Sequence, residues 1–435
     1  MREINFNKFH ERSEYISINF NFNMGKKIIQ KILKILARRV IKKYQSIVIG
    51  ITGSVGKSST KEAIYEILKN NFRARKSQGN YNNEIGLPLT ILGFPSAGKN
   101  IFGWLKIFIK VIFNLLPEKE NYPEILILEM AADHPGDIAY LLKIVKPQIG
   151  VLTSVSPSHL EFFKEVENVF AEKQLLIKNL PLNGWAILNK DDKLIASLEN
   201  KIKSKILTFG LGEEAMVRGI EIFLSQSLEE KEIELKGLQF KIKYQGNVVP
   251  IFLSGVISCS QVYAILAAVA VGLSLNLNLL TIANYLSSYK HLPSRMSVLK
   301  GKKEVVIIDD TYNSSPMAVK EALKTLLQIK LASGARKWIV LADMLELGKK
   351  SIDLHYEVGE EVAKGNFNFL LTYGKESIEI AKGAREKGMN EKNIFSFDKQ
   401  DQLIKFLEEN ILTGDIILVK GSRGMRMENV VKALI

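Results

Sequence analysis

Residues 50–60 follow a short apolar run and read Gly50-Ile-Thr-Gly53-Ser-Val-Gly56-Lys57-Ser58-Ser59-Thr60. The run of residues 46–52 predicts a buried parallel strand, and the spacing of residues 57–69 predicts a helix. Glycines between a strand and a helix let backbone N–H groups surround a polyphosphate at the positive end of the helix dipole. The stretch therefore predicts a loop that binds a nucleoside triphosphate, with ATP as the expected ligand.

The polar residues of this loop have defined chemical roles in such a site. Lys57 is expected to reach the β- and γ-phosphates, and the Ser58 hydroxyl to ligate Mg²⁺. The other loop residues expected to contact the nucleotide are Gly53, Ser54, Gly56 and Ser59. The strict G-x-x-x-x-G-K-[ST] pattern is not met, because position 51 is Ile. A glycine-rich turn before an ordinary helix is the alternative, and the strand–loop–helix context favours ATP binding.

Length and composition describe a folded multidomain protein. The 435 residues are 46% apolar and 24% charged, which predicts two or three domains with ordinary cores. A single cysteine, Cys259, excludes an internal disulfide framework and suits a reducing cytoplasm. No secretory signal pattern is found, and Lys106 and Lys110 interrupt the most apolar stretch. We therefore expect a cytoplasmic protein.

The net charge of +14 is concentrated near the N-terminus. Residues 26–43 hold eight Lys and Arg and no acid, so the remainder carries about +6. No nucleic-acid recognition motif accompanies this basic segment, and we expect no nucleic-acid partner.

Two segments have more than one interpretation. Residues 1–23 are expected to be poorly ordered, and residues 24–44 to form a basic amphipathic helix. Its apolar stripe either packs on the next domain or lies on the inner face of an anionic membrane. The aromatic-rich segment 101–116 is either an apolar hairpin packed on its domain or a second surface that touches lipid.

The rest of the chain predicts an α/β fold in two units. Strands at 46–52, 124–130, 148–153 and 185–189 alternate with helices at 57–70, 136–144 and 166–179, as in a mostly parallel sheet. Residues 205–254 predict a small antiparallel sheet, followed by helices at 259–273 and 277–288. Strands at 304–308, 337–342, 368–372 and 415–419 predict a second, Rossmann-like α/β unit. The expected domains are a tail and helix (1–45), a central ATP-binding domain (46–293) and a C-terminal domain (294–435).

Polar residues beyond two strands suggest a metal site. Glu129 ends an apolar strand, and a buried carboxylate near a phosphate loop is explained by a metal ion. His159 lies just beyond the next strand, where a structural role and a ligand role are both open. Lys173 lies on a helix, where solvent exposure is the ordinary expectation.

Seven segments, in order along the chain, resemble the Mur ligases, the ATP-dependent amide ligases of peptidoglycan precursor synthesis. They are Gly50–Glu62, Gly79-Asn-Tyr-Asn-Asn-Glu-Ile-Gly-Leu-Pro88, Leu128-Glu-Met-Ala-Ala-Asp-His-Pro-Gly136, Ser158-His-Leu-Glu-Phe-Phe163, Asp309-Asp-Thr-Tyr-Asn-Ser-Ser-Pro316, Ala342-Asp-Met-Leu-Glu-Leu-Gly348 and Lys420-Gly-Ser-Arg-Gly-Met-Arg-Met-Glu428. Within the family the resemblance is strongest to the branch that adds D-alanyl-D-alanine to UDP-N-acetylmuramoyl-tripeptide.

The resemblance implies a reaction through an acyl phosphate, with muramyl-peptide and amino-acid or dipeptide substrates. Positioned cations stabilise the charge that develops on phosphoryl and acyl oxygens. Glu129 and His159 match ligands of a second Mg²⁺, and Lys173 matches a lysine that is carbamylated in the family. The residues that match nucleotide contacts are Asn189, Asp192, Gln261, Arg295, Asp310, Tyr312 and Asn313. Those that match substrate contacts are Asn80, Asn82, Asn83, Lys420, Ser422 and Arg423.

Two departures from the family pattern stand out. The family's G-x-H-N-x-x-N segment near the adenine is Ser258-Cys259-Ser260-Gln261-Val-Tyr-Ala264 here, which predicts altered adenine recognition. This branch also begins with a UDP-binding domain, whereas about 45 residues precede the expected ATP-binding domain here. The resemblance therefore leaves open a different acyl substrate, lipid-linked or lacking UDP. A folylpolyglutamate-type ligase and an ATP-binding scaffold are further alternatives. We expect a monomer.

Overall fold

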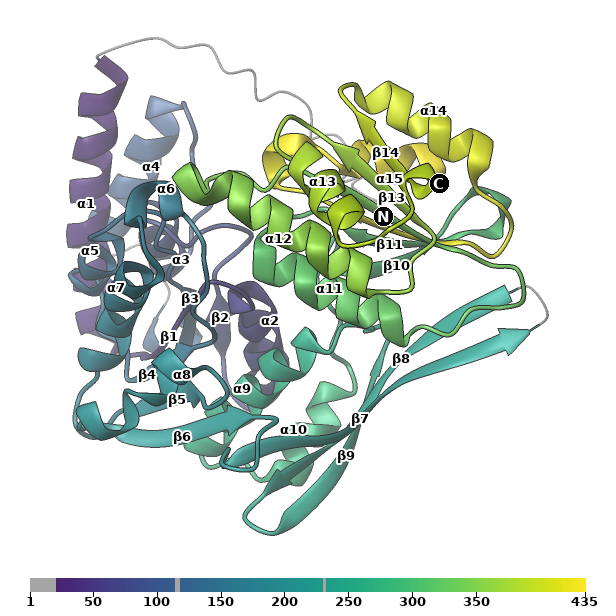
Figure 1. Cartoon of the computed structure of the whole chain (residues 1–435). Coiled ribbons are helices and arrows are strands. Elements are labelled where there is room, and N and C mark those ends of the chain that lie inside the picture. Colours follow the sequence, from purple (N-terminus) through teal and green to yellow (C-terminus); the bar gives the residue numbers. More distant parts are fainter. Residues whose placement is uncertain (1–20, 114–117, 230–231) are drawn as a thin grey trace, which may run out of the picture.

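The computed structural model describes residues 21–113, 118–229 and 232–435, and Figure 1 shows the arrangement of its elements. Two sheets, one of nine strands and one of six, form separate layers flanked by helices. This confirms the predicted α/β class. The predicted disorder of residues 1–23 falls mainly on residues 1–20, which lie outside the described residues.

The nine-stranded sheet carries the phosphate loop. Its strands in spatial order are β2 (Ala74–Lys76), β3 (Ile125–Glu129), β1 (Ile47–Thr52), β4 (Ile149–Leu152), β5 (Trp185–Asn189), β6 (Lys205–Gly210), β7 (Val217–Glu229), β8 (Glu232–Tyr244) and β9 (Asn247–Ser254). Neighbours are parallel from β2 to β7, and the pairs β7–β8 and β8–β9 are antiparallel. The predicted antiparallel strands therefore continue the parallel sheet and do not form a separate small sheet, because β7 starts in register beside β6.

Alternation along the central strands assigns each residue to one of two cores. Val48 packs with the helices on one face, whereas Ile49 and Ile51 pack with those on the other. The first face is covered by α1 (Asn21–Tyr44), α3 (Gly86–Leu92), α5 (Asp137–Leu142) and α7 (Val166–Lys178). The second is covered by α2 (Lys57–Leu68), α9 (Ser260–Ser274) and α10 (Leu279–Leu286). Short helices α6 (Leu160–Phe163) and α8 (Lys193–Ala196) follow β4 and β5.

The structure also decides how the two ambiguous segments pack. Helix α1 buries Leu33, Leu36, Ala37 and Val40 against the protein, so most of its apolar stripe is covered, whereas Ile28 and Ile35 are exposed. The aromatic-rich segment forms one helix, α4 (Ile101–Ile112), instead of a hairpin in the described residues, and residues 114–117 lie outside them. No helix of the described ranges is long and apolar enough to cross a membrane.

The six-stranded sheet forms the second unit. Its order is β10 (Ser297–Lys300), β11 (Val306–Asp310), β15 (Ile416–Lys420), β12 (Lys337–Ala342), β13 (Phe369–Tyr373) and β14 (Ile394–Phe397), with only β10 antiparallel to its neighbour. One face is covered by α11 (Pro316–Gln328), α12 (Ser351–Lys364) and α13 (Ile378–Glu386), and the other by α14 (Gln400–Asn410) and α15 (Glu428–Leu434). The sequence did not predict the short strands β2, β10 and β14. All three lie at sheet edges.

Candidate functional site

The loop between β1 and α2 has a backbone that only glycine adopts easily. Gly53 has a φ of 152°, and a Cβ there would lie 2.0 Å from Thr153 Oγ1. Gly56 precedes α2 with a φ of 88°. Gly50 instead lies within β1, where a Cβ would approach the Pro147 ring at 2.8 Å. Gly50 is therefore a packing residue of the strand, which explains why the glycine spacing departs from the strict motif.

The α2 N-terminus presents unpaired donors and a lysine to this loop. The first N–H groups of a helix have no partner within it, so they are available to an anion. Lys57 Nζ donates hydrogen bonds to the backbone oxygens of Gly53, at 2.7 Å, and Ser54, at 3.3 Å. Burial lowers the pKa of Lys57, and the nearby carboxylate of Glu129 opposes that effect. An arriving polyphosphate would replace carbonyl partners of Lys57 with a charged one.

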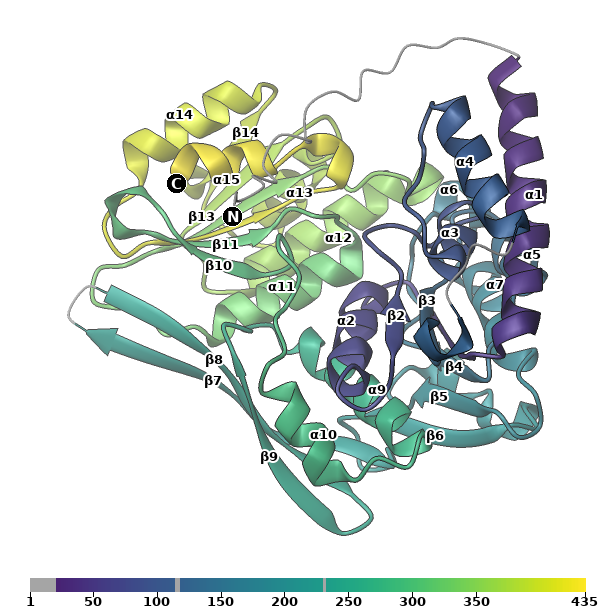
Figure 2. The same ribbon diagram turned by 180° about the vertical axis from the view of Figure 1, so that it is seen from behind.

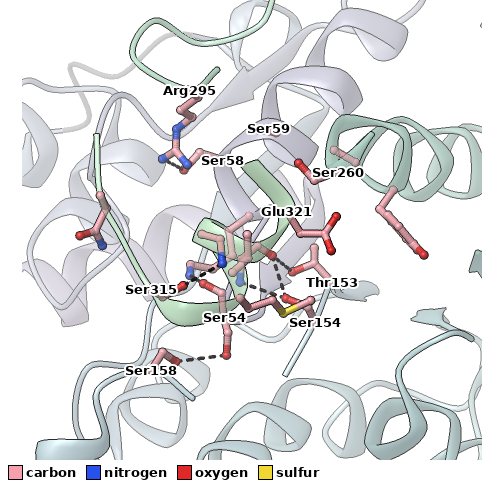
Figure 3. Close-up of a pocket in the computed structure, with 18 of the residues that line it drawn as sticks. Ser54, Ser58, Ser59, Thr153, Ser154, Ser158, Ser260, Arg295, Ser315 and Glu321 are labelled. Carbon is pink, nitrogen blue, oxygen red and sulfur yellow. Dashed lines mark hydrogen bonds between the residues drawn. The ribbon is translucent and has the colours of Figure 1, made fainter. Parts of the chain in front are cut away.

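A cavity of about 970 Å³ lies beside the loop, between the two sheets. Figure 3 shows Ser54, Ser58 and Thr153 of the first unit together with Arg295, Ser315 and Glu321 of the second unit. The predicted site residues that line it are Ser54, Gly56, Lys57, Ser58, Ser59, Asn82, Glu129, His159, Asn189, Gln261, Arg295, Asp310, Tyr312, Asn313, Lys420, Ser422 and Arg423. Asp192 also lines the cavity, whereas Gly53, Asn80, Asn83 and Lys173 do not.

Glu129 ends β3 as a buried carboxylate with three polar neighbours. Its Oε2 accepts a hydrogen bond from the Ser58 hydroxyl at 3.0 Å, and its Oε1 accepts one from Asn82 Nδ2 at 3.3 Å. Lys61 Nζ lies 3.5 Å from Oε2. The strand and the loop thus bring two of the three predicted metal ligands, Ser58 and Glu129, into direct contact.

His159 lies on the same cavity but contacts other acids. Its backbone is left-handed, with a φ of 51°, and it immediately precedes α6. Its Nδ1 lies 2.6 Å from Glu346 Oε2, and its Nε2 lies 3.4 Å from Asp133 Oδ1. His159 therefore links the two units through Glu346. Among the described residues, no three His, Cys, Asp or Glu side chains converge as a preformed metal site.

The donor chemistry near the loop nevertheless suits Mg²⁺. This ion prefers oxygen ligands and keeps several waters, so it requires few protein groups. A hydroxyl and a carboxylate, from Ser58 and Glu129, already lie together beside the phosphate loop. These two residues fit a magnesium ion that also binds phosphate oxygens.

Lys173 is buried on α7, contrary to the exposure expected of a helical lysine. Burial, together with the neighbouring charge of Lys57, lowers the pKa of Lys173 to about 7. The adjacent Glu172 accepts hydrogen bonds from the backbone N–H groups of Gly136 and Ile138, at 2.9 and 2.8 Å. A substantial fraction of Lys173 is therefore an uncharged amine near neutral pH, which is the nucleophilic form.

The residues predicted on the adenine side lie on strand ends and on α9. Asn189 Nδ2 donates to Thr153 O at 2.8 Å, and Gln261 Oε1 accepts from the Tyr289 hydroxyl at 3.1 Å. Asp192 caps α8 and accepts a hydrogen bond from Val155 N at 2.7 Å. These contacts position the cavity wall, with Gln261 buried at the start of α9.

In the second unit, the predicted residues form a linked cluster of charges. Arg295 Nη2 donates to Ser58 Oγ at 3.3 Å, and its guanidinium lies 4.0 Å from the centre of the Tyr312 ring. Buried Lys420 donates to Asp310 Oδ2 at 2.6 Å and to Asn313 O at 2.9 Å. The other two predicted residues make separate contacts. Ser422 Oγ accepts a hydrogen bond from Leu345 N at 2.9 Å, and the Arg423 guanidinium lies 5.6 Å from the centre of the Tyr312 ring.

The three asparagines predicted on the substrate side separate in the structure. Asn82 contacts Glu129, whereas Asn83 Oδ1 accepts from the N–H groups of Ile85 and Gly86 at the start of α3. Asn80 is exposed. Only Asn82 is placed at the cavity.

Four further residues shape the site and were absent from the sequence prediction. Lys61 follows Lys57 by four residues, so the two lie on one face of α2. Helical spacing could therefore have identified Lys61 as a neighbour of the site. Asp191 accepts from Tyr263 OH at 3.0 Å, at the cavity wall. Asp133 and Glu346 lie within two of the segments that resemble the family, but their contacts with His159 are tertiary, so the sequence did not assign them this role.

Comparison with known proteins identifies relatives over nearly the whole chain. The Mur ligase middle domain model matches residues 51–102 and 108–272, and the Mur ligase, glutamate ligase domain model matches residues 294–423. The UDP-N-acetylmuramoyl-tripeptide–D-alanyl-D-alanine ligase of Bacillus subtilis is 31% identical over 403 residues, covering 93% of this chain and 79% of that protein. The enzyme of the same name from Buchnera aphidicola is 32% identical over 391 residues, covering 89% and 75%.

A solved structure agrees with these relatives. The MurF ligase of Thermotoga maritima, in complex with ADP, superposes with a TM-score of 0.74 at 30% identity. The match covers 93% of this chain and 83% of that chain.

Proposed function

Because the chain belongs to the Mur ligase family, we propose that it joins D-alanyl-D-alanine to a muramyl-peptide precursor, with conversion of ATP to ADP. The observation that carries this proposal is a single cavity. It is lined by the phosphate loop, the Ser58–Glu129 pair and Arg295. Relatives at 31% and 32% identity are named for this reaction.

The reaction has two steps. In the first, a carboxylate oxygen of the muramyl peptide forms a bond to the γ-phosphorus of ATP, and the bond from phosphorus to the ADP oxygen breaks. In the second, the amine of the dipeptide forms a bond to the acyl carbon, phosphate leaves, and the amine nitrogen loses a proton. Both steps develop negative charge on oxygen, so fixed cations and dipoles lower the barriers.

The chain's own residues supply those cations. Lys57 and the N-terminus of α2 hold the phosphates, and Arg295 of the second unit reaches the same region beside Ser58. Mg²⁺ bound through Ser58 and Glu129 would neutralise phosphate charge. His159 is proposed as a further ligand, which requires it to exchange its contact with Asp133 or Glu346.

Lys173 is proposed to carry a carbamate, as the family resemblance implies. An uncharged amine attacks CO₂, its nitrogen forms the new C–N bond, and it loses one proton to give a carbamate. The low pKa of Lys173 favours the uncharged amine near neutral pH. A carbamate would give Lys173 a negative charge in place of a positive one. Its interaction with the Lys57 ammonium would then be favourable.

The second unit is proposed to close the site and exclude water. Arg295 Nε is buried and has no hydrogen-bond partner among the described residues, so an anionic ligand or a small rearrangement would satisfy it. Exclusion of water protects an acyl phosphate from hydrolysis. The proposed domain boundaries are 45/46 and 293/294. The second is supported by the sheets, which divide between β9 and β10, whereas α1 packs in the same core as the central strands.

The proposal also assigns the remaining site roles and partners. Nucleotide contacts are assigned to Asn189, Gln261, Asp310, Tyr312 and Asn313, and substrate contacts to Asn82, Lys420, Ser422 and Arg423. We propose a monomer that works in the cytoplasm and touches the inner face of the membrane through residues 24–44. The support for membrane contact is the exposed basic face of α1.

The decisive test measures ATP-dependent phosphate release with UDP-muramyl tripeptide and D-alanyl-D-alanine together. Release that requires both substrates is expected, with a product heavier by the dipeptide minus water in mass spectrometry. Lys57→Ala should abolish it, whereas Lys405→Ala, an exposed lysine of α14, should not. Release with other acyl substrates only would replace the proposed substrate, and no release with any pair would refute the ligase assignment.

A further inference from the structure

Helix α4 carries two apolar stripes, and only one of them is used by the core. Trp104, Ile107 and Val111 are buried against the protein. A second set on the same helix and its last turn is exposed: Ile101, Phe102, Leu105, Ile109, Ile112 and Phe113. Phe102 and Phe113 are 83% and 70% exposed, which is unusual for phenylalanine. The exposed stripe therefore calls for a partner that the described fold does not supply.

Helix α1 lies beside α4 at the edge of the molecule, away from the six-stranded sheet, in both Figure 1 and Figure 2. Most of its apolar stripe is buried, and most of its bases lie on the exposed face. Lys26 pairs with Glu84 at 3.2 Å. Five exposed bases of α1 form no ion pair among the described residues: Lys27, Lys31, Arg38, Arg39 and Lys42.

We propose that α1 and α4 together form a docking surface for an anionic lipid bilayer. The exposed stripe of α4 enters the interface between headgroups and acyl chains, and the bases of α1 contact lipid phosphates. This inference deepens the membrane contact given under the proposed function, because it adds the inserting element and names the lipid charge.

The chemistry of the surface selects lipid over other partners. Residues 26–43 contain no acid, so α1 complements an anionic surface over its full outer face. The exposed set on α4 has no hydrogen-bonding group, and Lys106 and Lys110 flank it on the same helix. An apolar stripe with lysines beside it matches a helix that lies in the plane of the interface. At 12 residues, α4 is too short to span a bilayer.

The two helices are expected to contribute separable effects. Each exposed base near an anionic surface contributes about fivefold to the partition coefficient at low salt. Replacement of Arg38, Arg39 and Lys42 by Gln should therefore weaken binding about 100-fold. Phe102→Ser with Phe113→Ser should weaken it at least tenfold, with little change in its salt dependence.

The experiment is co-sedimentation of the full chain with vesicles of 30% phosphatidylglycerol in phosphatidylcholine, compared with phosphatidylcholine alone. The matched apolar control is Leu182→Ser with Leu412→Ser, two exposed leucines far from α4 in sequence. The matched charge control replaces Lys349, Lys392 and Lys399 of the second unit by Gln, which gives the same net charge as the α1 variant. A Phe102→Trp variant reports insertion through a blue shift of its fluorescence.

Binding to anionic vesicles only, lost in the α1 and α4 variants but kept in both controls, is the expected result. Equal loss in test and control variants, or no blue shift of Trp at position 102, would overturn the proposal. Concentration-dependent self-association that the Phe102/Phe113 variant abolishes would assign the surface to a second copy of the chain. Phosphate release is measured without vesicles in every variant, so a failed ligase assignment and a failed docking surface give different results.

Discussion

Replacing Lys61 by Met tests whether this buried lysine holds Glu129 in place. Lys61 is 2% exposed, and its ammonium lies 3.5 Å from Glu129 and 3.8 Å from Glu62. Met has a similar length and no charge, so the substitution leaves a buried carboxylate without its cation. Removing one partner of a buried ion pair costs about 3–5 kcal/mol.

The lower end of that range applies here, because Glu129 keeps its hydrogen bonds from Ser58 and Asn82. A loss of about 3 kcal/mol lowers the melting temperature of a unit of this size by about 6–12 °C. The assay is thermal unfolding followed by circular dichroism at pH 7.5. Lys69→Met is the control, since Lys69 lies just after the same helix, is 37% exposed and, among the described residues, forms an ion pair with Glu66 alone. A surface pair contributes about 0–1 kcal/mol.

A double-mutant cycle makes the test specific. In Lys61→Met with Glu129→Gln, no buried charge is left unpaired at this contact. The loss of unfolding free energy in the double variant should therefore be smaller than the sum of the two single losses by about 2 kcal/mol. Strictly additive losses, or a Lys61→Met variant as stable as Lys69→Met, would show that the lysine does not position Glu129.

Three further perturbations test other parts of the site. Gly53→Ala should lower the free energy of unfolding by about 1–3 kcal/mol and abolish ADP binding in calorimetry. The added Cβ would be strained at the positive φ of Gly53 and would clash with the Thr153 hydroxyl. Unchanged ADP affinity would contradict the loop geometry. Because the pKa of Lys173 is lowered to about 7, the folded chain binds fewer protons than the unfolded chain from about pH 7 to 10.5. The free energy of unfolding should therefore rise with pH across that window, and Lys173→Met should reduce the rise in melting temperature between pH 7 and pH 9; equal slopes would refute a lowered pKa. Arg295→Lys keeps the charge but loses the planar contact with Tyr312, so kcat/KM for phosphate release should fall about 100-fold; unchanged kinetics would remove Arg295 from the site.

The local sequence predicted the helices, strands and loops that carry the site residues. It predicted fewer of the contacts between those residues. The strand–loop–helix at residues 46–69 and the carboxylate at the end of β3 follow from hydrophobic periodicity and from glycine at special backbone angles. The predicted small antiparallel sheet joined the main sheet instead, because the pairing of β7 beside β6 is a choice between distant strands. Edge strands of three or four residues carry too little pattern to be recognised.

Within the site, the sequence by itself determined the chemistry of the phosphate loop. Gly53, Gly56, Lys57 and Ser58 are neighbours in the chain, so their geometry depends on local backbone angles. Only the tertiary structure decided that Lys173 is buried near Lys57, that His159 meets Glu346 of the other unit, and that α1 buries most of its apolar stripe while α4 leaves one exposed. Burial and charge proximity arise between segments far apart in the chain, and no local pattern encodes which of them will meet.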